Sequence, residues 1–157
     1  CNFSRRTLSA DKSAKKIIRI AEEIGVSPEN MAIEITEDIV RSCDNTMAEN
    51  ISELKSEGFK IYLDDFGKAY TSIDDLTKFC PDVIKIDRNM LYNAKERQGR
   101  VVFESVIRLA RSIGAGVLCE GIETEEQAQI AKDAGCDFLQ GFYYYKPMSA
   151  ESLEGLL

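Results

Sequence analysis

Metal-binding or proton-transferring side chains stand at or near the ends of five short apolar segments. These are Met31–Ile35 with Glu34, Phe59–Leu63 followed by Asp64 and Asp65, Asp82–Ile86 with Lys85 and followed by Asp87, Ala115–Cys119 followed by Glu120, and Asp137–Leu139 followed by Gln140. Short apolar runs bounded by turn residues are typical of buried strands. Because parallel strands of one sheet end at the same edge, we expect these side chains to form one site.

The chemistry available to such a site is that of oxygen ligands. The 157-residue chain contains no histidine, which excludes Ser/His and Cys/His catalysis and most zinc and copper sites. Carboxylate and amide oxygens suit Mg²⁺ or Mn²⁺. The net charge of −7 and the lack of a basic stripe argue against a DNA or RNA polymer as partner. A phosphate substrate would need a metal ion to invert the local charge.

The length and composition of the chain fit one globular domain without a membrane-spanning segment. Of the residues, 44% are hydrophobic and 30% charged, which is ordinary for a folded protein. No apolar run reaches membrane-spanning length and the N-terminus lacks the features of a signal peptide, although a longer parent protein could be membrane-anchored. The five cysteines are odd in number and form no C-x-x-C pair. They favour reduced thiols in a cytoplasmic protein, with a zinc site as the weaker alternative.

Stretches with helical spacing separate the five segments. Expected helices start at Ser9 or Asp11 and stop at Gly25, run from Asp44 to Gly58, from Ser72 to Phe79, from Glu96 to Ile113 and from Thr124 to Ala134, and begin again at Ser149. Strands that alternate with helices predict a parallel sheet or a (β/α) barrel. The fold class is therefore α/β.

The number of strands is too small for a closed barrel. Five strands and a strand tail at Cys1–Phe3 compare with eight strands and about 250 residues in a complete barrel. The chain is interpreted as the C-terminal two-thirds of an incomplete TIM-like (β/α) barrel. An open barrel leaves two exposed sheet edges, which invite pairing with another chain. We therefore expect a homodimer or a strand-swapped oligomer.

Six short motifs follow one another in a fixed order. They are Asn2-Phe3-Ser4-Arg5, Glu34-Ile35-Thr36-Glu37, Asp64-Asp65-Phe66-Gly67, Lys85-Ile86-Asp87, Glu120-Gly121-Ile122-Glu123-Thr124 and Gln140-Gly141-Phe142 with a later proline, Pro147. Each motif alone is weak. The ordered set closely resembles the EAL family of cyclic-di-GMP phosphodiesterases, whose patterns are N-x-S, E-x-T-E, D-D-F-G, K-I-D, E-G-V-E and Q-G-Y. Residues 1–157 would then be one EAL-like domain that lacks its N-terminal strands and helices.

The resemblance implies a site for two metal ions that hydrolyses cyclic-di-GMP to the linear dinucleotide pGpG. Asn2, Glu34 and Asp64 match the residues that bind the first ion in the family. Asp64 would bridge to a second ion held by Asp65 and Glu120. Two such ions can activate a water molecule for in-line attack on phosphorus.

The resemblance also assigns roles around the metal ions. Lys85 matches a lysine that orients the attacking water, and Glu120 is also the general-base candidate. Gln140 matches a glutamine that hydrogen-bonds to the metal-bound water. Asp87 and Glu123 complete their motifs and are expected to lie one layer further from the metal ions, where they hold these groups in position.

A loop after the paired aspartates is implied to couple the site to a dimer contact. Gly67, Ala69 and Tyr70 belong to this loop, and Glu37 would anchor it. Most relatives carry glycine where this chain has Ala69. If that position needs a positive φ, its Cβ costs on the order of 1 kcal/mol.

Other interpretations stay open. Asp64-Asp65 could be a turn or helix cap, Glu34 could face solvent, and Lys85 could be a surface lysine. The E-A-L motif, whose glutamate is a metal ligand in relatives, is absent from this chain. The alternative function is therefore a catalytically silent module that binds cyclic-di-GMP or a protein, and a third is a different metal-dependent barrel phosphoesterase. A parent protein is expected to carry sensor or cyclase domains.

Overall fold

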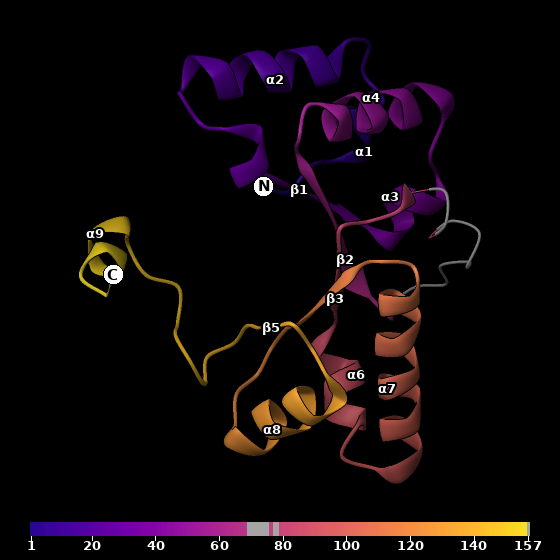
Figure 1. The fold of residues 1–157 in the computed structure, drawn as a ribbon, viewed down its shortest axis with the longest axis vertical. Coiled ribbons are helices and arrows are strands. Elements are labelled where there is room, and N and C mark those ends of the chain that lie inside the picture. The colour runs from indigo at the N-terminus through magenta and orange to yellow at the C-terminus, as the bar shows by residue number, and fades with distance from the viewer. Residues whose placement is uncertain (69–75, 77–78, 157) are drawn as a thin grey trace.

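The computed structural model describes residues 1–68, 76 and 79–156, and its centre is a parallel sheet. The strands are β1 (Ala32–Thr36), β2 (Lys60–Phe66), β3 (Val83–Ile86), β4 (Gly116–Cys119) and β5 (Phe138–Leu139). They lie in the order β1-β2-β3-β4-β5, and every neighbouring pair is parallel (Figure 1). The predicted five strands and the α/β class are confirmed.

Helices connect the strands, as parallel pairing requires. They are α1 (Arg5–Leu8), α2 (Ser13–Glu23), the 3₁₀ helix η1 (Pro28–Asn30), α3 (Glu37–Arg41), α4 (Asn45–Ser56), α6 (Arg88–Asn93), α7 (Arg97–Ser112), α8 (Glu125–Ala134) and α9 (Ala150–Glu154). Figure 1 shows α2 and α4 side by side at one end of the molecule and α6, α7 and α8 grouped at the other. The predicted helix at 72–79 lies largely outside the described residues.

The predicted start of the first helix is wrong. Two helices form, because the Ser4 hydroxyl accepts a hydrogen bond from the Thr7 N–H (3.2 Å) and caps α1. Helix α2 follows Lys12, whose backbone is left-handed (φ 57°) and whose side chain makes no cap. Ser9, one of the two expected caps, instead donates its hydroxyl to Asp44 Oδ2 (2.8 Å).

Helix caps elsewhere agree with the sequence pattern. Asp44 accepts from the Met47 N–H (2.8 Å) at the start of α4. Thr124 and Gln127 form a reciprocal capping box at the start of α8. The short helices α3 and α6 were not predicted. Each follows a strand directly, with Thr36 and Asp87 as their N-cap residues.

The strands begin one residue later than predicted, and for β3 and β5 the reason lies in a side chain. The Asp82 carboxylate accepts from the Ile61 N–H and the Asp137 carboxylate from the Val117 N–H, each at 2.8 Å. These aspartates therefore substitute for a backbone carbonyl just before β3 and β5. Strand β2 extends further than predicted, through Phe66, so that Asp64 and Asp65 belong to it.

The core lies against the sheet and is built by alternation along the strands. Successive strand residues point to opposite faces, so the buried Ile33 and Ile35 flank Glu34 on the other face of β1. All four residues of β3 are buried, including Lys85. Helix α7 contributes the fully buried Phe103. One face of the sheet thus packs on apolar helix surfaces while polar side chains collect on the other.

The sheet is open at both edges in the part of the chain that is described. At one edge, Cys1–Phe3 runs alongside β1: the Glu34 N–H donates to the Cys1 carbonyl (2.8 Å) and the Phe3 N–H to the Glu34 carbonyl (3.0 Å). The expected strand tail is therefore a single parallel bridge at Asn2. At the other edge lies the two-residue β5. None of the helices described is both long and apolar enough to cross a bilayer.

Candidate active site

The Lys85 ammonium lies between three carboxylates toward the carboxyl ends of neighbouring strands. Its Nζ is 2.9 Å from Asp64 Oδ1, 2.9 Å from Glu120 Oε1 and 3.4 Å from Glu34 Oε1. Glu34 is on β1, Asp64 on β2 and Lys85 on β3, and Glu120 directly follows β4. Four consecutive strands thus bring together four of the predicted residues, and the interpretation of Lys85 as a surface lysine is wrong, since it is 5% exposed.

The environment of Lys85 keeps it positively charged. Burial by itself would lower the pKa of the ammonium, but the hydrogen bonds to Glu120 and Asp64 and their negative charges outweigh it and raise the pKa above its ordinary value. Lys85 is therefore a fixed cation at neutral pH. It is suited to hold carboxylates and a phosphate in place, and it is unsuited to accept a proton.

Asp64, Asp65 and Glu120 form a cluster of possible metal ligands, with one oxygen of each within 4.8 Å of the others. Neighbouring strand residues normally point to opposite faces, so Asp64 and Asp65 would diverge. Asp65 avoids this because its backbone is left-handed (φ 59°) and the register with β3 shifts between Leu63 and Phe66. This irregularity is typical of a β-bulge, which can re-aim a side chain at an active site.

These residues fit a divalent ion by their chemistry. Carboxylate oxygens are the ligands that Mg²⁺ and Mn²⁺ prefer, and the three acids are half-buried rather than spread over an exposed surface. Glu34 is linked to the cluster because the Lys85 ammonium, which contacts Asp64 and Glu120, also contacts Glu34. Asn2 lies beside Glu34 through their backbone bridge.

A second ionic group borders the cluster. Lys68 Nζ lies 2.6 Å from Asp65 Oδ1 and 3.1 Å from Asp87 Oδ2. The hydrogen bonds to these two carboxylates raise the pKa of Lys68. Burial would raise the pKa of Asp87, but the Asn89 N–H (2.9 Å) and Lys68 outweigh it, so that the pKa is lowered. Asp87 is thus an ionised cap of α6 that also fixes Lys68 beside Asp65.

The loop predicted to couple the site to a dimer is described only in part. Glu37 is 3% exposed and shares a small cavity of about 130 Å³ with Asp65 and Lys68. Gly67 has a left-handed backbone (φ 102°), and a Cβ on it would lie 2.5 Å from Met90 Cε. Ala69 and Tyr70 lie outside the described residues.

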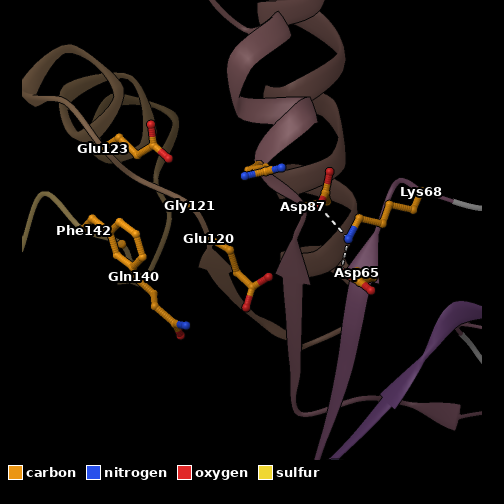
Figure 2. Close-up of a pocket in the computed structure, with 10 residues that line it drawn as sticks. Asp65, Lys68, Asp87, Glu120, Gly121, Glu123, Gln140 and Phe142 are labelled. Carbon is orange, nitrogen blue, oxygen red and sulfur yellow. Dashed lines mark hydrogen bonds and ion pairs between the residues drawn. The ribbon is translucent and has the colours of Figure 1, made fainter. Parts of the chain in front are cut away.

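A cavity of about 370 Å³ opens beside the cluster (Figure 2). The predicted residues that line it are Asp65, Asp87, Glu120, Glu123 and Gln140, and the others are Lys68, Arg88, Gly121, Gly141 and Phe142. Figure 2 shows Gln140 and Glu123 on the side of the cavity opposite Asp65 and Lys68. Five of the predicted site residues therefore line one cavity, on two facing sides.

Two glycines allow the backbone to approach closely around this cavity. A Cβ on Gly141 would lie 2.0 Å from the Ile122 carbonyl oxygen and 2.3 Å from the Ile122 nitrogen, a clash that only glycine avoids. Gly121 is left-handed (φ 68°). The close approach at Gly141 lets the Ile122 N–H donate to the Gln140 carbonyl (3.1 Å), which ties the loop after β4 to the end of β5.

Sequence reasoning did not single out Lys68 or Arg88. Lys68 follows Asp65 by three residues and Arg88 directly follows Asp87, so proximity to predicted acids was the only signal available. Basic residues at such positions are common on surfaces. Their roles became visible when the fold placed both on one cavity wall.

Comparisons with known proteins identify the family of the chain. The family model described as "EAL domain" matches residues 1–147. The chain is 37% identical over 152 residues to the biofilm architecture maintenance protein MbaA of Vibrio cholerae, covering 97% of this chain and 19% of that protein. It is 32% identical over 148 residues to the cyclic di-GMP phosphodiesterase RocR of Pseudomonas aeruginosa, covering 94% and 38%.

Among solved structures, the fold superimposes on the EAL enzyme Bd1971 in its form with cAMP and cyclic-di-GMP bound. The TM-score is 0.92 at 26% identity, over 99% of this chain and 41% of that one. The chain thus spans well under half the length of each of these three proteins. Its parallel sheet corresponds to part of a TIM-like barrel, as predicted. The motifs, the site and these matches together show that the chain belongs to the EAL domain family.

Proposed function

We propose that this domain hydrolyses one phosphodiester bond of cyclic-di-GMP and releases the linear dinucleotide pGpG. The observation that carries the proposal is the burial of Lys85 among Glu34, Asp64 and Glu120 at the ends of adjacent strands. A buried ammonium that faces three carboxylates is costly to build for stability alone. The name of the relative RocR, a cyclic di-GMP phosphodiesterase, supplies the substrate class.

Mg²⁺ or Mn²⁺ is the proposed cofactor. Asp64, Asp65 and Glu120 would hold the ions, with Glu34 and Asn2 as further ligands of the first. When bound, two such ions would supply a water of lowered pKa and offset the charge that develops on the phosphate oxygens.

The chain's own side chains would carry the remaining steps. Glu120 would accept the proton of the attacking water as the new phosphorus–oxygen bond forms. The phosphorus–oxygen bond to the departing ribose would break, and the released ribose oxygen would take up a proton from the solvent. Lys85 stays protonated and lies 2.9 Å from Glu120, so it would orient the attacking water and offset the negative charge around it. Gln140 would hydrogen-bond to the attacking water from the cavity wall, while Asp87 keeps Lys68 against Asp65.

Further parts of the proposal concern the protein around the site. We place the domain in the cytoplasm, as one unit over residues 1–157, within a parent that carries sensor or cyclase domains. It would pair with a second copy, and Glu37, Gly67, Ala69 and Tyr70 would couple that contact to Asp65.

A catalytically silent cyclic-di-GMP-binding module is the second candidate. The observation in its favour is that Lys85 already neutralises part of the carboxylate charge of Asp64 and Glu120. A site with this internal cation can accept an anionic ligand without turnover.

The test measures pGpG release from cyclic-di-GMP with Mn²⁺ or Mg²⁺. Glu120→Gln keeps the size of the side chain but removes its charge, and we expect it to lower kcat by about 10²–10⁴-fold, the usual contribution of a general base. Glu126→Gln is the matched control, because its side chain is 65% exposed on α8. Unchanged turnover in Glu120→Gln would contradict the assigned role. Metal-dependent binding without turnover in the unaltered chain would favour the silent module.

A further inference from the structure

Arg88 is a cation on the wall of the large cavity, and no residue that the structure describes pairs with it. It lines the 370 Å³ cavity that also holds Asp65 and Glu120, and it lines a neighbouring cavity of about 300 Å³. Among the described residues, its guanidinium makes no hydrogen bond or ion pair. An exposed arginine between two cavities is free to bind a ligand that enters either one.

The charge balance of the cavity makes this arginine distinctive. Its described lining carries four carboxylates, those of Asp65, Asp87, Glu120 and Glu123, and two cations, Lys68 and Arg88. Lys68 is already bound to Asp65 at 2.6 Å and to Asp87 at 3.1 Å. Among the lining residues that the structure describes, Arg88 is therefore the cation that remains available to an anionic ligand.

The packing of Arg88 fixes where its side chain begins. A Cβ on Gly121 would lie 2.5 Å from Arg88 Cβ and 3.3 Å from its Cδ. The aliphatic part of Arg88 therefore lies against the bare backbone of Gly121, the residue that follows Glu120. This contact holds the arginine next to the acidic cluster while its guanidinium stays exposed to solvent.

The proposed substrate has two phosphodiesters, and only one of them is cleaved. With the scissile phosphate at the Asp64–Asp65–Glu120 cluster, the second phosphate has to lie elsewhere in the same acidic cavity, where it needs a cation. A guanidinium binds phosphate through two parallel hydrogen bonds, which gives orientation as well as affinity. We propose, resting on the proposed function, that Arg88 binds the uncleaved phosphate and so selects a cyclic dinucleotide over ligands with one phosphodiester.

The experiment measures binding by calorimetry in the presence of Ca²⁺. Cyclic-di-GMP is compared with the linear dinucleotide GpG, which has one phosphodiester and no further phosphate. Arg88→Met keeps the aliphatic packing on Gly121 and removes the charge, and Arg88→Lys keeps a charge without the planar fork. Arg108→Met is the control, because Arg108 is 68% exposed on α7 and lines neither cavity.

We expect Arg88→Met to weaken cyclic-di-GMP binding by about 10-fold to 100-fold, the usual loss for a hydrogen bond to a charged group. Arg88→Lys should recover part of this loss. Binding of GpG should stay within about 2-fold of the unaltered chain, and the control should leave both ligands unaffected.

Two results would overturn the assignment. Equal affinity of Arg88→Met and the unaltered chain for cyclic-di-GMP would show that Arg88 does not contact it. An equal loss for both ligands would place Arg88 at the cleaved phosphate or at a base. Failure of the unaltered chain to bind cyclic-di-GMP would instead overturn the proposed function, and this inference with it. Unfolding midpoints of each variant separate lost contacts from lost folding.

Discussion

Replacing Lys85 by methionine should destabilise this protein in the absence of divalent ions. Methionine retains the unbranched, flexible character of the lysine chain but removes the ammonium that faces Glu34, Asp64 and Glu120. Removing one partner of a buried ion pair typically costs about 3–5 kcal/mol. The three carboxylate side chains are 15–21% exposed and so keep some hydration. We therefore expect Lys85→Met to lower the free energy of unfolding by the lower end of this range, about 3 kcal/mol.

The assay is thermal or denaturant unfolding with a chelator present. For a chain of this length, about 3 kcal/mol corresponds to a fall in Tm of about 6–12 °C. Lys95→Met is the control, because Lys95 pairs with the exposed Glu126 at 3.1 Å, and exposed pairs contribute about 1 kcal/mol or less. A Lys85→Met midpoint equal to that of the unaltered chain would refute the electrostatic account of this site.

Added Mg²⁺ or Mn²⁺ gives the prediction a second test. A divalent ion would take over the neutralising role of the ammonium, and at about 100 times its Kd it would return about 2.7 kcal/mol. We expect a larger metal-dependent rise in Tm for Lys85→Met than for the unaltered chain, where Lys85 competes for the same oxygens. An equal rise in both proteins would mean that the ions bind away from Lys85.

The remaining predictions concern a glycine and an acid of the cavity wall. Gly141→Ala places a Cβ 2.0 Å from the Ile122 carbonyl oxygen and should lower the free energy of unfolding by about 1–3 kcal/mol, as overpacking does. Urea unfolding measures this loss. Gly155→Ala is the control, because the nearest atom to its Cβ would be at 3.6 Å. Asp87 has a folded-state pKa below its ordinary value of 3.8, so its contribution to stability is complete above that value and is lost as pH falls through the lowered folded pKa. Asp87→Asn should therefore flatten the acid limb of stability against pH below about pH 5, and an unchanged limb would contradict the role assigned to the Asn89 and Lys68 hydrogen bonds.

Much of the fold could be predicted because local rules and tertiary contacts agree. The four-residue β3 is apolar except for Lys85, and the stretch between Glu96 and Gly114 has the spacing of α7. Asp44 and Thr124 begin helices as their side chains predict. The prediction that the first helix starts at Ser9 or Asp11 was wrong for two reasons. An equally good cap, Ser4, lies five residues upstream of Ser9. Lys12 adopts a left-handed backbone that no side-chain signal marks.

The sequence by itself predicted which residues form the candidate site, since the chain has no histidine and its Asp, Glu, Lys, Asn and Gln motifs follow strands in a characteristic order. The tertiary structure decided how they meet. The bulge at Asp65 turns two consecutive acids toward one site, and parallel pairing brings Lys85 within reach of acids 51 and 35 residues away along the chain, at Glu34 and Glu120. It also placed Arg88 against Gly121. Backbone dihedrals and long-range packing set these positions, and neither can be predicted from the local pattern of residues.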